Sequence, residues 1–102
     1  MSESIVKTKS FLLAIGGVAL YKFLIESKRE YVMSKQFLRS VTSVGANVRE
    51  AINAQSKVDF IHKLSISQKE CDETLYWLEL LNATSYLSNS EFEKFIVKQM
   101  KS

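Results

Sequence analysis

The chain contains no proline in its 102 residues. Proline is the strongest breaker of α-helices, so its complete absence favours long uninterrupted helices. Apolar residues recur every three or four positions along the middle of the chain, which is typical of helices that bury one face. One such row is Met33, Phe37, Val41, Val44, Val48 and Ala51, and a second is Phe60, Leu64, Ser67, Cys71, Leu75, Leu78 and Leu81.

Helix-capping signatures divide the sequence into four parts. Ser27, Ser56 and Ser88 each precede an acidic residue by three positions, the spacing of a capping box. Ser67 and Glu70 share this spacing but lie inside a helical row, so we interpret them as a false positive. The caps predict helices over residues 4–26, 29–54, 57–86 and from 89 to the end. Because short joints between long helices force antiparallel neighbours, the sequence predicts an all-α, antiparallel up-and-down four-helix bundle with a short fourth helix, forming one domain over residues 1–102.

The first predicted helix is apolar around most of its circumference. Residues 11–20 form an apolar and glycine run after Lys7 and Lys9, the length of a signal-peptide core. An acid at Glu3, the lack of a cleavage pattern and the early charge at Lys22 favour a buried helix with no membrane span. The surplus of apolar surface predicts self-association. It comes from Phe11, Leu12, Ile15, Val18, Leu20, Phe23 and Leu24.

A polar row follows helical spacing beside the apolar one. Arg39 is the natural partner for Glu70 or Glu73, because its planar fork can bind a carboxylate with two hydrogen bonds. Such a row predicts a hydrogen-bonded network that fixes the register of two helices, and the alternative is a recognition site. The row consists of Arg39, Ser43, Asn47 and Glu50 on the second segment, and Glu70, Glu73 and Thr74 on the third.

The residue types of most catalytic and metal sites are scarce. His62 is the only histidine and Cys71 the only cysteine, and their spacing of nine places them on opposite sides of one helix. No glycine-rich phosphate loop or nucleophile motif is present. The sequence therefore predicts a non-enzyme with no catalytic residue, metal or cofactor. An active site would have to be assembled across subunits. A single cysteine also fits the reducing cytoplasm.

The charge is mildly basic, with a net charge of +3 and a pI near 9.0. Residues 31–70 carry six Lys or Arg against three acids, whereas residues 71–102 carry three against five. This asymmetry is compatible with a polyanion partner, although two solvated faces would produce it too. The candidate nucleic-acid contacts are Lys28, Arg29, Lys35, Arg49, Lys57, Lys63 and Lys69.

Residues 36–81 resemble the bacterial four-helix-bundle proteins named after the 23S ribosomal RNA intervening sequences. That family has an R-S-x-x-S-x-x-A-N-x-x-E block, then S-x-x-D-F, then E-x-x-E-T. The matching residues here are Arg39, Ser40, Ser43, Ala46, Asn47 and Glu50, then Ser56, Asp59 and Phe60, then Glu70, Glu73 and Thr74. The chain departs from the pattern in its short fourth helix and its apolar stretch at residues 15–18.

The resemblance implies an up-and-down bundle that assembles into a ring-like homopentamer. It also implies kinship with the accessory proteins of diversity-generating retroelements, which bind a reverse transcriptase and nucleic acid. We therefore expect an oligomeric accessory protein that binds RNA or DNA through backbone phosphates, with weak sequence specificity because no base-reading motif is present. The alternative is a protein-interaction or scaffold module that does not bind nucleic acid.

Overall fold

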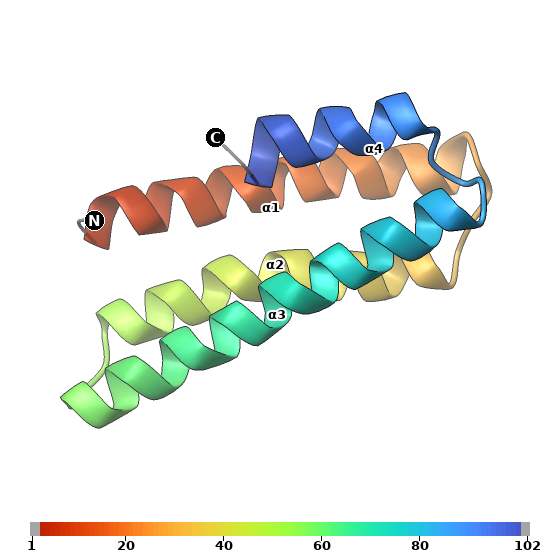
Figure 1. The fold of residues 1–102 in the computed structure, drawn as a ribbon. Coiled ribbons are helices and arrows are strands. Elements are labelled where there is room, and N and C mark those ends of the chain that lie inside the picture. Colours follow the sequence, from red (N-terminus) through yellow and green to blue (C-terminus); the bar gives the residue numbers. More distant parts are fainter. Residues whose placement is uncertain (1–2, 101–102) are drawn as a thin grey trace.

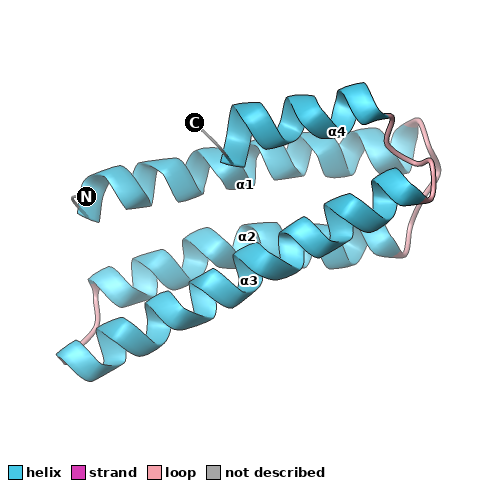
Figure 2. Cartoon of the chain, viewed as in Figure 1, coloured by secondary structure: helices cyan, strands magenta, loops and turns pink. Residues whose placement is uncertain are grey.

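The structure, a computed structural model, describes residues 3–100 as a bundle of antiparallel helices (Figure 1). Helix α1 spans Glu3–Glu26, α2 Met33–Ile52, α3 Lys57–Ala83 and α4 Asn89–Phe95, and α4 continues into a π-helical turn, η1, over Ile96–Met100. No strand occurs in this part of the chain (Figure 2). The predicted fold class is confirmed, including the short fourth helix, which runs along only part of α1 in the 43 × 24 × 19 Å molecule.

Two of the three predicted caps are confirmed. The Ser88 hydroxyl accepts from the N–H of Glu91, and the Glu91 carboxylate accepts from the N–H of Ser88, so α4 begins with a complete capping box. The Ser56 hydroxyl accepts from the N–H of Asp59 at 3.1 Å and caps α3. Both serines satisfy N–H groups that have no partner within their helix.

The cap predicted at Ser27 is wrong, and so is the predicted start of the second helix at residue 29. Arg29 adopts a positive φ of 55°, which turns the chain between the helices. The buried Glu30 caps α2 instead, because its carboxylate accepts from three backbone N–H groups at 2.7–3.2 Å. Those groups belong to Val32, Met33 and Ser34.

Helix α3 ends at Ala83, three residues earlier than predicted. Ser85 has a positive φ of 69°, and the N–H groups of Tyr86 and Leu87 fold back to the carbonyl of Leu81. This turn buries Leu87 and directs α4 back along the bundle. The predicted false positive inside α3 is confirmed, since the Ser67 hydroxyl donates to the Val44 carbonyl on α2 and caps nothing.

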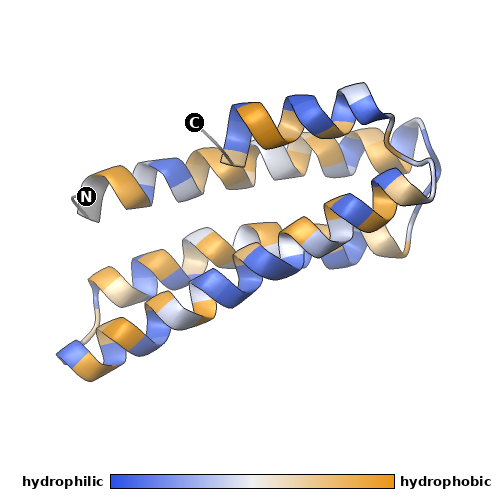
Figure 3. Cartoon of the chain, viewed as in Figure 1, coloured by the Kyte–Doolittle hydropathy of each residue, from blue (hydrophilic) through white to orange (hydrophobic). Residues whose placement is uncertain are grey.

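The core lies at the end of the bundle that α4 covers. Leu24, Phe37, Leu78 and Leu81 are completely buried there. The ring of Phe37 meets that of Phe95 edge to face, with 5.8 Å between centroids. Figure 3 shows apolar residues along α1 as well, including the stretch that α4 does not reach. The short α4 thus completes the core at one end and leaves much of α1 uncovered.

Helix α1 is long and apolar enough to cross a membrane by length and composition alone, over Ile5–Glu26 with a mean hydropathy of 1.5. Residues 11–20 alone are too short to span a membrane. The helix that contains them is longer. Only 22% of this stretch is buried in the bundle. Core helices of soluble proteins can pass the same test, so the finding by itself places α1 in no membrane.

Candidate nucleic-acid interface and the polar seam between α2 and α3

Helices α2 and α3 are joined by buried hydroxyl groups. The Thr74 hydroxyl lies 3.0 Å from that of Ser40 and donates to the Glu70 carbonyl at 2.8 Å. Two turns before Thr74 on α3, Ser67 donates to the Val44 carbonyl of α2 at 2.9 Å. Small hydroxyl side chains allow the two backbones to approach closely while their polar groups stay paired. The polar row predicted from the sequence included Thr74 but neither Ser40 nor Ser67, although Ser67 lies in an apolar row and Ser40 in the family motif.

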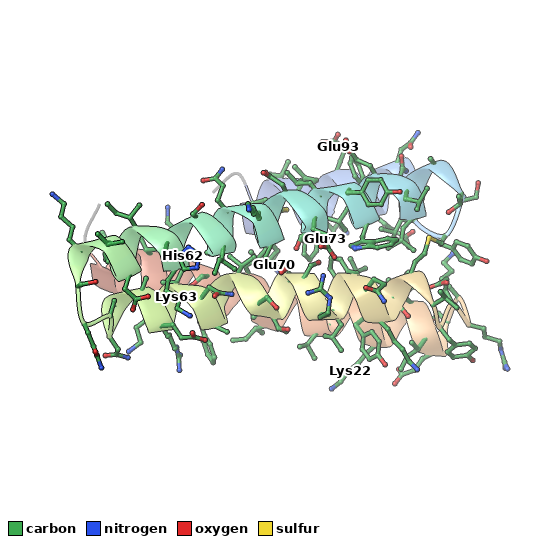
Figure 4. The ribbon with its side chains drawn as sticks, turned by 90° about the horizontal axis from the view of Figure 1, so that it is seen from below. Lys22, His62, Lys63, Glu70, Glu73 and Glu93 are labelled. Atoms are coloured by element: carbon green, nitrogen blue, oxygen red, sulfur yellow. The ribbon has the colours of Figure 1, made fainter. Side chains whose placement is uncertain are left out.

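Arg39 bridges two carboxylates of α3. Its Nη1 donates to Glu70 Oε2 at 3.3 Å, and its Nη2 donates to the Glu73 carboxylate. Trp77 Nε1 also donates to Glu73 Oε2, at 3.0 Å. Figure 4 shows Glu70 and Glu73 along the α3 side of this seam. The Trp77 and Arg39 hydrogen bonds lower the pKa of Glu73, and the Glu73 and Glu70 hydrogen bonds raise the pKa of Arg39. Among the described residues, Glu70 Oε1 is buried without a hydrogen-bond partner.

The rest of the predicted polar row bonds differently. Ser43 donates to the Arg39 carbonyl at 2.7 Å and Asn47 to the Ser43 carbonyl at 2.9 Å, so both are satisfied within α2. Glu50 pairs with Lys63 of α3 at 2.9 Å. The row therefore forms separate cross-links between α2 and α3 rather than one continuous network. Every cross-link holds the two helices in register, which is a structural role.

The seam offers no general base or nucleophile pair. His62 is exposed on α3, and burial, followed by the charge of Asp72, raises the pKa of the Cys71 thiol. A raised thiol pKa means a poor nucleophile at neutral pH. Among residues 3–100, no three His, Cys, Asp or Glu side chains gather as a metal site.

The seven candidate cations do not form one surface. Lys28 and Arg29 lie in the joint between α1 and α2, whereas Lys57 begins α3 at the opposite end of the bundle. Lys63 is held by Glu50, which raises its pKa, and the ammonium of Lys28 lies 5.6 Å from the centre of the Phe23 ring. The remaining three, Lys35, Arg49 and Lys69, are exposed along α2 and α3.

Arg49 lies on the side of α2 that faces α1, and Lys35, fourteen residues earlier, lies within about 40° of it around the helix. The Arg49 guanidinium lies 5.0 Å from the centre of the Phe11 ring, close enough for a cation–π contact. Beside this pair is a hollow of about 330 Å³ between the helices. It is lined by Ser10, Phe11, Ala14, Thr42, Gly45, Ala46 and Arg49.

The outer side of α1 is apolar and uncovered. Phe11, Leu12 and Ile15 each leave about half of their surface exposed, at 51%, 53% and 52%. Val18 is 36% exposed, and a shallow hollow of about 440 Å³ follows this side. We refer to Leu12, Ile15, Val18 and Ala19 as the α1 outer face. Apolar patches of this kind mark interaction surfaces.

The fold and the polar seam define the chain as a small up-and-down helical bundle. A family model described as 23S rRNA-intervening sequence protein matches residues 2–101. The chain belongs to this family of 23S rRNA-intervening sequence proteins, as the resemblance of residues 36–81 predicted.

One solved structure extends this result. It is a protein of unknown function from the S23 ribosomal protein family of Bacteroides thetaiotaomicron, 50% identical to this chain. The match covers 99% of this chain and 90% of that one, with a TM-score of 0.94. No curated protein matches the chain.

Proposed function

We propose that this protein is a non-enzymatic, oligomeric accessory protein that associates with nucleic acid, RNA in the first place, through backbone phosphates. The observation that carries the proposal is that most of the candidate cations form no ion pair with a described carboxylate. Of the seven candidates, only Lys63 lies within ion-pair distance of a described carboxylate. Cations that no internal carboxylate neutralises remain available to phosphates.

Self-association is the second part of the proposal, and the α1 outer face supports it. A stable interface buries about 800 Å² on each partner, and half-exposed Leu12 and Ile15 supply an apolar centre for one. The resemblance implies a ring of five copies. A bound protein such as a reverse transcriptase would contact the assembled oligomer.

Light scattering tests the oligomer, with absorbance recorded at 260 and 280 nm to detect bound nucleic acid. We expect a mass of several chains, and the variant Ile15→Glu to lower it by placing a charge on the α1 outer face. Val58→Glu is the matched control, since Val58 is 79% exposed at the start of α3, away from this face. A monomeric wild-type protein would contradict the proposed self-association.

Nucleic-acid binding is tested by fluorescence anisotropy at two salt concentrations. Phosphate contacts release counterions, so affinity must fall as salt rises. No binding at low salt would contradict the proposal. The second candidate function, a protein-interaction module, is favoured by the same α1 outer face. A complex from the native host with a protein partner and no RNA would support it.

A further inference from the structure

We propose that the groove between α1 and α2 is the track for a single-stranded nucleic acid, with phosphates at its two basic ends and a base stacked on Phe11. This inference rests on the proposed nucleic-acid association and names its site. We define the basic α1/α2 groove by the cations Lys7, Lys22, Lys35 and Arg49, around the hollow beside Phe11.

The contacts between α1 and α2 place these cations in two groups. A Cβ added to Gly45 would lie 3.2 Å from the Ser10 carbonyl oxygen, and one added to Gly17 would lie 2.5 Å from Val41. These two contacts fix the antiparallel register. Five residues beyond Gly17 is Lys22, and six before Val41 is Lys35, so these two lysines lie at the same level.

The second group lies at the other end of the groove. Arg49 contacts the Phe11 ring, and Lys7 is one helical turn before Phe11 on the same side of α1. At 1.5 Å per residue, the fourteen residues from Lys35 to Arg49 span about 21 Å along α2. The groove therefore presents positive charge at both ends of a track long enough for several nucleotides.

No described carboxylate forms an ion pair with any of the four cations. The nearest acid in sequence is Glu3 for Lys7, Glu26 for Lys22, Glu30 for Lys35 and Glu50 for Arg49. Glu50 is engaged by Lys63 on the α3 side of α2. Figure 4 shows Lys22 projecting away from the bundle, far from Glu70, Glu73 and Glu93.

The hollow at the Arg49 end of the groove suits close approach by a polymer. Small residues, Ala14, Gly45 and Ala46, line it beside Phe11 and Arg49. Phe11 is 51% exposed and offers a ring face for base stacking, beside a guanidinium that can contact a phosphate. Phosphate-binding cations with an aromatic platform are typical of single-strand binding without sequence preference.

The groove adjoins the α1 outer face. Phe11 and Ala14 line both the hollow between α1 and α2 and the shallow hollow along the outer face, which Lys22 also lines. Leu12, Ile15 and Ala19 line a further hollow with Lys9 and Gln99. The sequence reasoning included Lys35 and Arg49 and missed Lys7 and Lys22, because these two cations flank an apolar run.

The test is a fluorescence-anisotropy titration of the full chain with labelled oligouridine and with the matching oligothymidine. We expect Lys35→Glu/Arg49→Glu to weaken binding at least tenfold at low salt. The matched control Lys94→Glu/Lys98→Glu changes the net charge equally but lies on α4 and η1, outside the candidate contacts, and should weaken binding less than threefold. Circular dichroism of each variant checks that it is folded.

Two further measurements separate phosphate contact from stacking. Four phosphate contacts to a single strand predict a slope of about −3 for the logarithm of affinity against that of salt, and the double groove variant should reduce its magnitude by about 1.4. Phe11→Leu keeps the apolar contact but removes the aromatic ring. It should weaken binding about tenfold with an unchanged salt slope.

The outcomes are distinct. If the wild-type protein binds and both double variants lose affinity equally, the groove is contradicted while nucleic-acid association stands. If the wild-type protein does not bind at low salt, both proposals fail. Two results together would also overturn the single-strand track. The first is that duplex or polyglutamate competes for binding as strongly as oligouridine does, and the second is that Phe11→Leu has no effect on binding. Oligouridine and oligothymidine together show whether the 2′-hydroxyl contributes.

Discussion

Helices α2 and α3 contact each other through a completely satisfied set of hydroxyl cross-links, whereas α1 leaves its outer face to solvent. Ser67, Thr74 and Ser40 are buried between α2 and α3. By contrast, only 22% of the apolar stretch of α1 is buried. The difference shows that buried polar contacts join α2 to α3, whereas α1 keeps most of its apolar surface exposed, and our proposals place the partners on α1.

The largest expected effect is a loss of stability when a buried core residue is truncated, compared with an exposed residue of α1. Leu78 is completely buried, so Leu78→Ala should lower the free energy of unfolding by about 2–5 kcal/mol. Leu12 is 53% exposed, and Leu12→Ala should change it by less than about 0.5 kcal/mol in the monomer. Urea unfolding at low protein concentration measures both. Equal losses in the monomer would contradict the comparison.

The two adjacent glycines of α1 should respond with opposite signs. A Cβ on Gly17 would meet the buried Val41, 2.5 Å away, so Gly17→Ala should destabilise the fold by about 1–3 kcal/mol. A Cβ on Gly16 would meet only the movable end of Gln99, so Gly16→Ala should stabilise by up to about 1 kcal/mol through helix propensity. The thermal unfolding midpoints of the two variants, compared with that of the wild-type protein, test this prediction. If both midpoints shifted in the same direction, Gly16 and Gly17 would not lie on an open and a closely packed side of α1.

The ion pairs of the seam should matter less than its hydroxyl groups and apolar core. Arg39 is about half exposed, so Arg39→Ala should lower the free energy of unfolding by only about 0.2–1 kcal/mol. A double-mutant cycle with Glu73→Gln isolates the pair. Coupling that persists at high salt would show that the pair is better shielded from solvent than the structure indicates.

The smallest effect is a pH dependence. The hydrogen bonds from Trp77 and Arg39 lower the pKa of Glu73 below its ordinary value of 4.5. A lowered carboxyl pKa contributes stability above the unfolded-state pKa, and this stability is lost as pH falls through the folded-state pKa. The free energy of unfolding should therefore decrease below about pH 4.5, and less steeply in Trp77→Phe, which lacks the N–H donor. Identical slopes would exclude Glu73 as the titrating group.

The fold was largely predictable because its determinants are local. Apolar spacing and the caps at Ser56 and Ser88 depend on residues a few positions apart, and both are read directly from the chain. The first joint was mispredicted because Arg29 takes a positive φ and a buried glutamate replaces the serine cap, which depends on the packing around Glu30. The candidate nucleic-acid contacts remain predictions, since the sequence lists cations without saying which share a face.

The sequence by itself determined that this chain forms long helices, that these pack as an up-and-down bundle with a short fourth helix, and that Arg39 has carboxylate partners within reach. Only the tertiary structure decided that Lys22 and Lys35 lie at one level on neighbouring helices and that the Arg49 guanidinium lies over the Phe11 ring. The physical reason is distance along the chain. Helical periodicity fixes which residues share a face of one helix, but the register between two helices is set by contacts such as Ser10 with Gly45 and Gly17 with Val41.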